Sequence, residues 1–85
     1  GAVAAQHHLD GSADLASLAG AAALQQGRDG CAVARQTAAD NGVHVVNCSL
    51  VAGDLVVAVE DTVPLPFGID GILSSAARAG PDAGS

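Results

Sequence analysis

The stretch "NGVHVVNCSLVAGDLVVAV", residues 41–59, decides the fold of this chain. It opens with an Asn-Gly pair that stops a helix, and two runs of alternating valines follow, separated by a tight turn at Gly53 and Asp54. This pattern predicts a β-hairpin with strands at 43–51 and 55–63. Residues two apart share a face of a strand, so we expect an apolar face made of Val46, Cys48, Leu50, Leu55, Val57 and Val59. Glu60 and Thr62 point the other way, which leaves the sheet with one solvated face.

The residues before the hairpin predict two helices. Residues 2–26 contain no proline, and Leu15, Leu18, Ala19 and Ala22 follow the i, i+3, i+4, i+7 spacing of one helix face. We expect one long helix, frayed or bent near residues 11 and 12, where a glycine precedes a serine. The turn "GRDG" at 27–30 then offers Gly27 as a left-handed cap for this helix and Asp29 as the N-cap of a short helix at 31–40.

Small side chains form a second pattern on the long helix. Spacings of three and four residues place Ala13, Ala16, Gly20 and Ala23 in one strip that lets another helix approach closely. The sequence leaves two possibilities for the helix that packs against this strip: the second helix of the same domain, or a helix of another subunit.

The C-terminal part of the chain admits two interpretations. Helical spacing connects Ile69, Ile72, Leu73, Ala76 and Ala77, whereas strand alternation connects Leu73, Ser75, Ala77 and Ala79. We expect one α+β domain over residues 1–79, followed by a disordered tail at 80–85, "GPDAGS".

Cys31 and Cys48 are the two cysteines of the chain, one at the start of the predicted second helix and one in the first strand. A helix that folds back on a sheet brings such positions together, and a disulfide closing a loop of this size contributes about 3 kcal/mol. We therefore predict a structural disulfide, which belongs to an oxidising compartment. Two buried free thiols, or a metal site that includes His44, are the alternatives, although no paired zinc-ligand spacing accompanies the cysteines.

Composition excludes several classes of function. Nine acidic residues against three Lys and Arg give a net charge of −6, and Phe67 is the single aromatic residue, so the chain lacks the basic surface and stacking rings of nucleic-acid binding. His7, His8, Asp10 and Asp14 have helical spacing, but adjacent histidines point about 100° apart, and we interpret them as solvated helix surface rather than a metal site. We expect no catalytic residues, no cofactor, no bound metal and no small-molecule substrate.

The order of these features resembles the TadE-like proteins encoded near Flp/Tad pilus and secretion genes in high-GC bacteria. The resemblance runs from Gly11 to Pro81 through "GSADLASLAGAAAL", "GCAVARQTAADNGVHVVNCSLVAGDLVVAV", "PLPFG" and "AARAGP". Its most specific part is the cysteine pair around "AADNG", followed by the "GD" turn and alternating valines. The resemblance favours a third strand over a third helix at residues 69–79.

The resemblance implies a non-enzymatic minor pilin or pseudopilin-like subunit. Its partners would be other pilin subunits and pilus assembly proteins, and an apolar N-terminal helix, missing from this chain, would anchor it in the inner membrane. The protein would then be extracytoplasmic, either membrane-anchored or at the cell surface. A small secreted binding module that acts independently on a cell-surface or host partner is the alternative.

Overall fold

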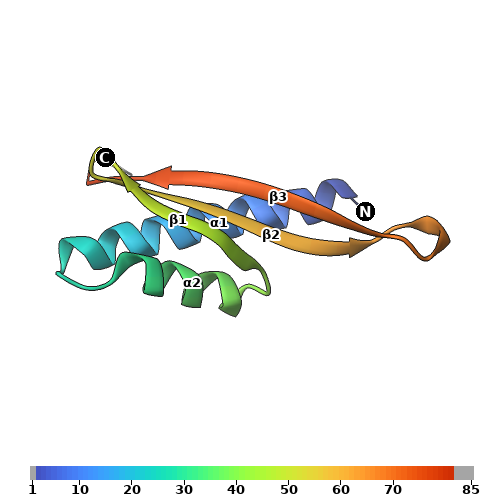
Figure 1. The fold of residues 1–85 in the computed structure, drawn as a ribbon, viewed down its shortest axis with the longest axis horizontal. Coiled ribbons are helices and arrows are strands. Elements are labelled where there is room, and N and C mark those ends of the chain that lie inside the picture. Colours follow the sequence, from blue (N-terminus) through green and yellow to red (C-terminus); the bar gives the residue numbers. More distant parts are fainter. Residues whose placement is uncertain (1, 82–85) are drawn as a thin grey trace.

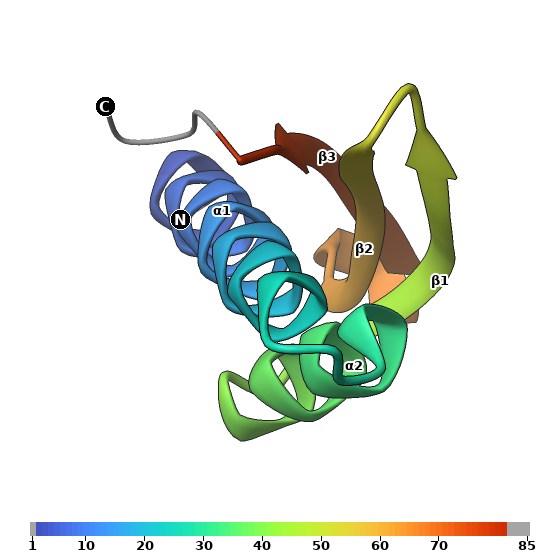
Figure 2. The same ribbon diagram turned by 90° about the vertical axis from the view of Figure 1, so that its left-hand side faces the viewer.

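The computed structural model describes residues 2–81, which form two helices and a three-stranded antiparallel sheet (Figure 1). The elements are α1 (Ala2–Gln25), α2 (Gly30–Asp40), β1 (His44–Val51), β2 (Asp54–Pro64), the short 3-10 helix η1 (Pro66–Gly68) and β3 (Asp70–Ala79). Both helices lie on one face of the sheet, whose strand order is β1-β2-β3, and the opposite face is open (Figure 2). The predicted α+β class, with two helices, a hairpin and a third strand, is confirmed.

Backbone caps of the predicted kind separate the two helices. At the end of α1, Gly27 adopts a left-handed φ of 74°, and the Arg28 amide donates to the Ala23 carbonyl at 2.9 Å. This six-to-one bond defines a Schellman motif. Two residues later the Asp29 side chain accepts a hydrogen bond from the Ala32 amide at 3.0 Å and caps α2.

The same motif ends α2 and directs the chain into the sheet. Gly42 has a φ of 76°, and the Val43 amide donates to the Ala38 carbonyl at 3.0 Å. Val43 is 1% exposed, because the motif turns its side chain into the core. The sequence prediction that Asn41 and Gly42 stop the second helix is confirmed.

The turn between β1 and β2 lies one residue earlier than the sequence predicts. Ala52 and Gly53 occupy it, with φ values of 52° and 85°, and Val51 pairs with Asp54 across its base. Positive φ at both central residues is what a two-residue hairpin turn of type I′ requires. Asp54 is thus already the first residue of β2.

A β-bulge in β1 changes the predicted apolar face. The register shifts between Val45, which pairs with Val59, and Asn47, which pairs with Ala58. Val45 therefore packs against the core, and Val46 is 53% exposed instead of sharing the face of Cys48. Simple alternation wrongly placed Val46 because it does not anticipate the extra residue.

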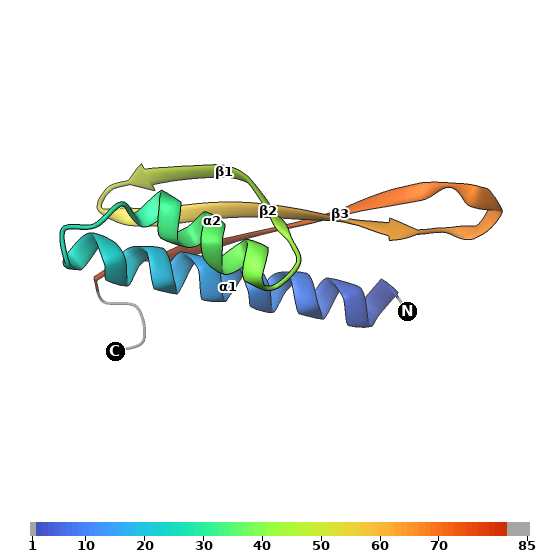
Figure 3. The same ribbon diagram turned by 90° about the horizontal axis from the view of Figure 1, so that it is seen from below.

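β2 and β3 form a long ribbon that extends past the helices. The pairing runs from Leu55 with Ala79 to Pro64 with Asp70, and the far part of the ribbon projects beyond the body of the molecule (Figure 3). As a result the molecule is elongated, with extents of 47 × 23 × 20 Å. The strand interpretation of residues 69–79 is confirmed, and the helical one is wrong.

The core lies between the near part of this ribbon and the two helices. Its buried residues are mostly alanines and valines, namely Leu9, Ala13, Ala16, Ala21, Ala34, Ala38, Val43, Leu55, Val57, Val59 and Ala79. α1 passes Gly11 and Ser12 without a break, contrary to the prediction of a frayed or bent helix. The Ser12 hydroxyl donates to the His8 carbonyl at 2.8 Å within the helix, so this buried serine does not interrupt it.

The predicted domain boundary at residue 79 coincides with the end of β3. Gly80 and Pro81 follow the strand, and Gly80 lies against the Asp54 side chain. Residues 1 and 82–85, including most of the predicted disordered tail, lie outside the described residues.

Candidate interaction surfaces

A disulfide joins Cys31 to Cys48, with Cα atoms 5.9 Å apart. It connects the first turn of α2 to the middle of β1 and so closes the side of the core that α1 does not cover (Figure 2). The predicted pairing is confirmed. The alternatives of two free thiols or a metal site at these cysteines are excluded, because both sulfur atoms are used in the bond.

The strip of small residues on α1 lies inside the domain. Its members Ala13, Ala16, Gly20 and Ala23 are all buried. A Cβ atom added at Gly20 would lie 2.6 Å from the Gly30 carbonyl oxygen and would collide with Leu55. The strip is therefore the contact of α1 with α2 and β2, and the alternative that it faces another subunit is wrong.

The opposite side of α1 carries an exposed apolar seam. Leu15 and Leu18 are 52% and 47% exposed, and the other members of this seam, hereafter the outer face of α1, are Ala4, His8, Gly11 and Ala22. These positions alternate in steps of four and three residues, as the a and d positions of a coiled coil do. Two leucines identified from the sequence as one helix face thus lie on the face that points away from the core.

The tip of the β2–β3 ribbon is a second apolar surface, hereafter the hairpin tip, and it consists of Leu65, Phe67 and Ile69. Their exposures are 45%, 98% and 58%. Phe67 has φ 67° and ψ 24°, a left-handed conformation that costs a non-glycine residue about 1–2 kcal/mol. The loop is closed by the Leu65 amide, which donates to the Ile69 carbonyl at 2.7 Å. A large ring held in an unfavourable conformation and left in water contributes nothing to the core.

Sequence reasoning missed the hairpin tip. The signal was present in "PLPFG", because a proline and a glycine on either side of Phe67 place this one aromatic side chain in a turn instead of the core.

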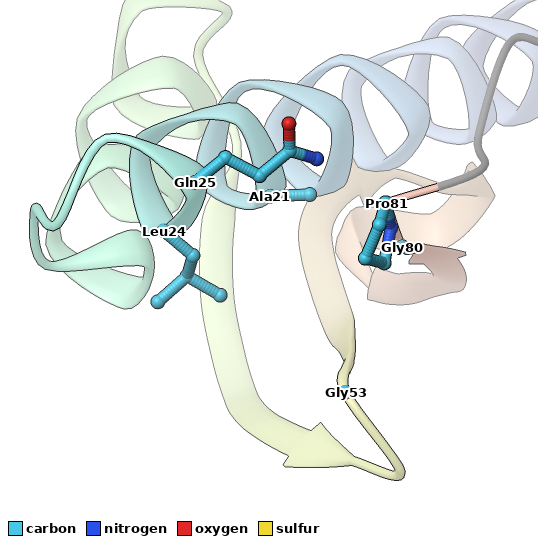
Figure 4. Close-up of a pocket in the computed structure, with 6 residues that line it drawn as sticks. All are labelled: Ala21, Leu24, Gln25, Gly53, Gly80 and Pro81. Carbon is cyan, nitrogen blue, oxygen red and sulfur yellow. The ribbon is translucent and has the colours of Figure 1, made fainter.

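An apolar hollow lies at the other end of the molecule, near the β1–β2 turn (Figure 4). Its volume is about 210 Å³, and it is lined by Ala21, Leu24, Gln25, Gly53, Gly80 and Pro81. The last turn of α1 forms one wall, and the segment after β3 forms the other (Figure 4).

Polar side chains of α1 fasten the helix to its neighbours. His8 Nε2 lies 2.9 Å from the Asn41 carbonyl oxygen, which ties α1 to the end of α2. Asp10 accepts hydrogen bonds from the Ser75 hydroxyl at 2.5 Å and from Gln6 Nε2 at 3.0 Å, and these bonds lower the pKa of its carboxyl group.

Two of the residues considered as metal ligands in the sequence, His8 and Asp10, thus have hydrogen-bond partners within the domain. Asp14 and His7 are exposed on α1, and His44 is exposed at the start of β1. Among residues 2–81, no three His, Cys, Asp or Glu side chains are grouped as a metal ion would need. The described residues do offer two apolar contact surfaces, the outer face of α1 and the hairpin tip.

Within the described part of the chain, neither helix has the length and apolar character that crossing a bilayer demands. No family model, curated protein or solved structure matches the chain.

Proposed function

We propose that this protein is a minor pilin or pseudopilin-like subunit of a Flp/Tad pilus assembly or secretion system, and that it acts by helix packing rather than by catalysis. The observation that carries the proposal is the outer face of α1. A 24-residue helix presents Leu15 and Leu18 to solvent at coiled-coil spacing while its small residues fill the core. Helices with such a seam pair with other helices through it.

The chemistry of this face suits a helical partner. Gly11 and Ala22 lie beside the two leucines, and no atom lies within 4 Å of a Cβ added at Gly11. A second helix can therefore approach the backbone of α1 closely, with the leucines filling the space on either side. The polar neighbours His7, Asp14 and Gln25 would form the rim of such a contact.

Two further observations support the proposal. The Cys31–Cys48 disulfide stabilises a domain whose core is mostly alanine and valine, as expected for a small protein of an oxidising, extracytoplasmic compartment. The sequence resemblance to TadE-like proteins covers both cysteines and continues to Pro81. It implies an apolar membrane helix ahead of α1, so that the outer face of α1 would meet neighbouring subunits just outside the inner membrane.

Site-specific photo-crosslinking in the cells that encode the protein tests this proposal. A crosslinker at Leu18 should capture pilus or secretion subunits from the membrane fraction. The control position is Arg35, which is exposed on α2 away from the seam. Crosslinks that form equally at both positions, or no crosslinks at Leu18, would contradict packing through the outer face of α1.

The hairpin tip supports the alternative function, a secreted module that acts independently on a cell-surface or host partner. An exposed ring on a protruding ribbon is a common form of contact residue. Recovery of the protein as a free monomer from culture medium, with none in the membrane fraction, would favour this alternative over a pilus subunit.

A further inference from the structure

The two ends of the molecule are complementary, and we infer that the hairpin tip of one copy docks into the hollow of the next, so that the protein associates head to tail. The inference concerns surfaces other than the outer face of α1, and the two can be tested separately. The projecting element is Phe67 with Leu65 and Ile69, and the recess is the hollow between α1, the β1–β2 turn and the segment after β3.

The sizes of the two features agree. A cavity of about 150 Å³ with apolar walls accommodates a benzene ring. The hollow, at about 210 Å³, has room for the ring of Phe67 while the adjacent Leu65 and Ile69 rest on its rim. Ala21, Leu24 and Pro81 offer apolar contacts to an aromatic ring, and Gly53 leaves the entrance unobstructed by a side chain.

The conformation of the tip prepares it for insertion. Pro66 and the bond between Leu65 and Ile69 fix the loop, and Phe67 is held outward in a left-handed conformation. Strain of this kind at an exposed position is typical of contact residues. Because the loop is already ordered, docking does not require a flexible segment to lose its conformational freedom.

Charge supports the head-to-tail orientation. The outer part of the ribbon carries Glu60, Asp61 and Asp70, and no basic residue lies between Arg35 and Arg78 in the sequence. The end with the hollow carries Arg78, which pairs with Asp54 at 2.6 Å, and Arg28, which has no ion-pair partner among residues 2–81 and is followed by the exposed Asp29. This end therefore lacks the excess of negative charge on the ribbon, so an acidic ribbon approaches it with less repulsion than it would approach another ribbon.

The placement of the two surfaces determines the form of the association. They lie at opposite ends of the long axis (Figure 1), so copies joined end to end leave a free hollow at one end and a free tip at the other. Such a heterologous contact does not close after two copies and instead builds open chains. A second copy of this chain is the occupant that we infer, because its hairpin tip matches the hollow in size and apolar character.

Sedimentation velocity of the purified protein tests the inference. Wild type should show species beyond the dimer whose share grows with concentration, up to about 1 mM. Phe67→Gly keeps the backbone of the loop and removes the ring, and Gln25→Trp fills the hollow from an exposed position of α1. Each variant alone should associate at least 10-fold more weakly, because burial of a phenylalanine ring corresponds to a factor of roughly 10–100 in affinity.

Mixing the two variants gives the most specific result. The intact tip of Gln25→Trp can enter the intact hollow of Phe67→Gly, so the mixture should form a dimer of one copy of each and nothing larger. A mixture that stays monomeric, or that forms long chains, would contradict docking between tip and hollow.

Three control proteins show whether association is specific to the tip and the hollow. Val46→Ser removes an exposed apolar side chain from β1, away from the tip and the hollow, and should leave association unchanged. Leu18→Ser should also leave it unchanged, and a loss there would instead assign self-association to the outer face of α1. A chain ending at Pro81 keeps every lining residue and should associate like the full sequence. Monomeric wild type at 1 mM that instead binds phosphatidylcholine vesicles through Phe67 would overturn the inference in favour of lipid.

Discussion

The inner and outer faces of α1 reverse the usual distribution of side-chain size. The inner face, toward the sheet and α2, is made largely of alanine and glycine, whereas Leu15 and Leu18 point into solvent. Close approach explains the inner face, because a Cβ at Gly20 already collides with α2 and β2. Folding explains the outer face less well, since Leu15 and Leu18 remain 52% and 47% exposed among residues 2–81. The difference teaches that size, not hydrophobicity alone, decides which face of this helix is buried.

Two leucines on opposite faces provide the largest test of this comparison. Leu9 is fully buried, and Leu9→Ala should lower the free energy of unfolding by about 2–5 kcal/mol because it leaves a cavity. Leu18 is 47% exposed, and Leu18→Ala should change stability by only about 0.5 kcal/mol. Urea denaturation of both variants measures the difference. Equal losses would show that the outer face is also part of the folded core.

Removal of the Cys31–Cys48 disulfide measures how much this bond contributes to holding α2 against the rest of the domain. The double variant Cys31→Ala/Cys48→Ala should lose about 3 kcal/mol, because the unfolded chain regains the freedom of the loop between the cysteines. Thermal unfolding with and without reductant should give the same loss for wild type. Non-reducing mass spectrometry checks the bond itself, and an unchanged melting temperature after reduction would show that packing alone holds α2.

The same substitution at two glycines of α1, one on each face, gives the next comparison. Gly20→Ala places a methyl group 2.6 Å from the Gly30 carbonyl oxygen and should destabilise the domain by about 1–3 kcal/mol. Gly11→Ala lies on the outer face with open space around it and should stabilise the helix by about 1 kcal/mol. The opposite signs are the informative result. If Gly20→Ala were neutral, the helices would be less closely packed than the structure shows.

The smallest effect concerns the border between the two faces, where Asp10 accepts hydrogen bonds from Ser75 and Gln6. These bonds lower the pKa of Asp10 in the folded protein. Their contribution to stability is therefore present above the ordinary carboxyl pKa of about 4 and is lost as pH falls through the lower, folded value. Ser75→Ala should be less stable than wild type at pH 7, and the difference should shrink as pH falls below about 4.

Ser74→Ala is the matched control for that measurement, because Ser74 is an exposed neighbour that lies on the other face of β3. It should show no pH-dependent difference from wild type in urea denaturation. A pH-independent effect of Ser75→Ala would mean that its hydroxyl does not interact with the Asp10 charge.

Local sequence signals predicted most of the fold. Gly27, Asp29 and Gly42 marked helix ends because their backbone or side-chain chemistry is specific to caps. The cysteine pair was also predictable, because a helix that folds back on the following strand brings the two positions close together. The strand at 70–79 was ambiguous from residues alone, because alanine and serine fit both periodicities, and only the resemblance favoured the strand.

Features that depend on three-dimensional packing escaped prediction. The bulge at Val46 requires knowledge of the register against β2. The orientation of α1 depends on how closely α2 approaches, so the sequence alone did not determine which helix packs against the strip at Gly20. The proline and glycine beside Phe67 indicate a turn, but the projection of that turn beyond α1 and α2 depends on the length of the β2–β3 pairing.

The bulge in β1 also protects the protein from aggregation. β1 is an edge strand, and its mostly apolar segment without charge or proline, "VVNCSLV", has the composition of segments that stack into cross-β fibrils. The bulge interrupts the regular edge on which another strand would pair, and the disulfide at Cys48 keeps the segment attached to α2. A chain that remains reduced exposes this segment whenever it unfolds. We therefore expect the reduced chain to form fibrils more readily than the oxidised chain.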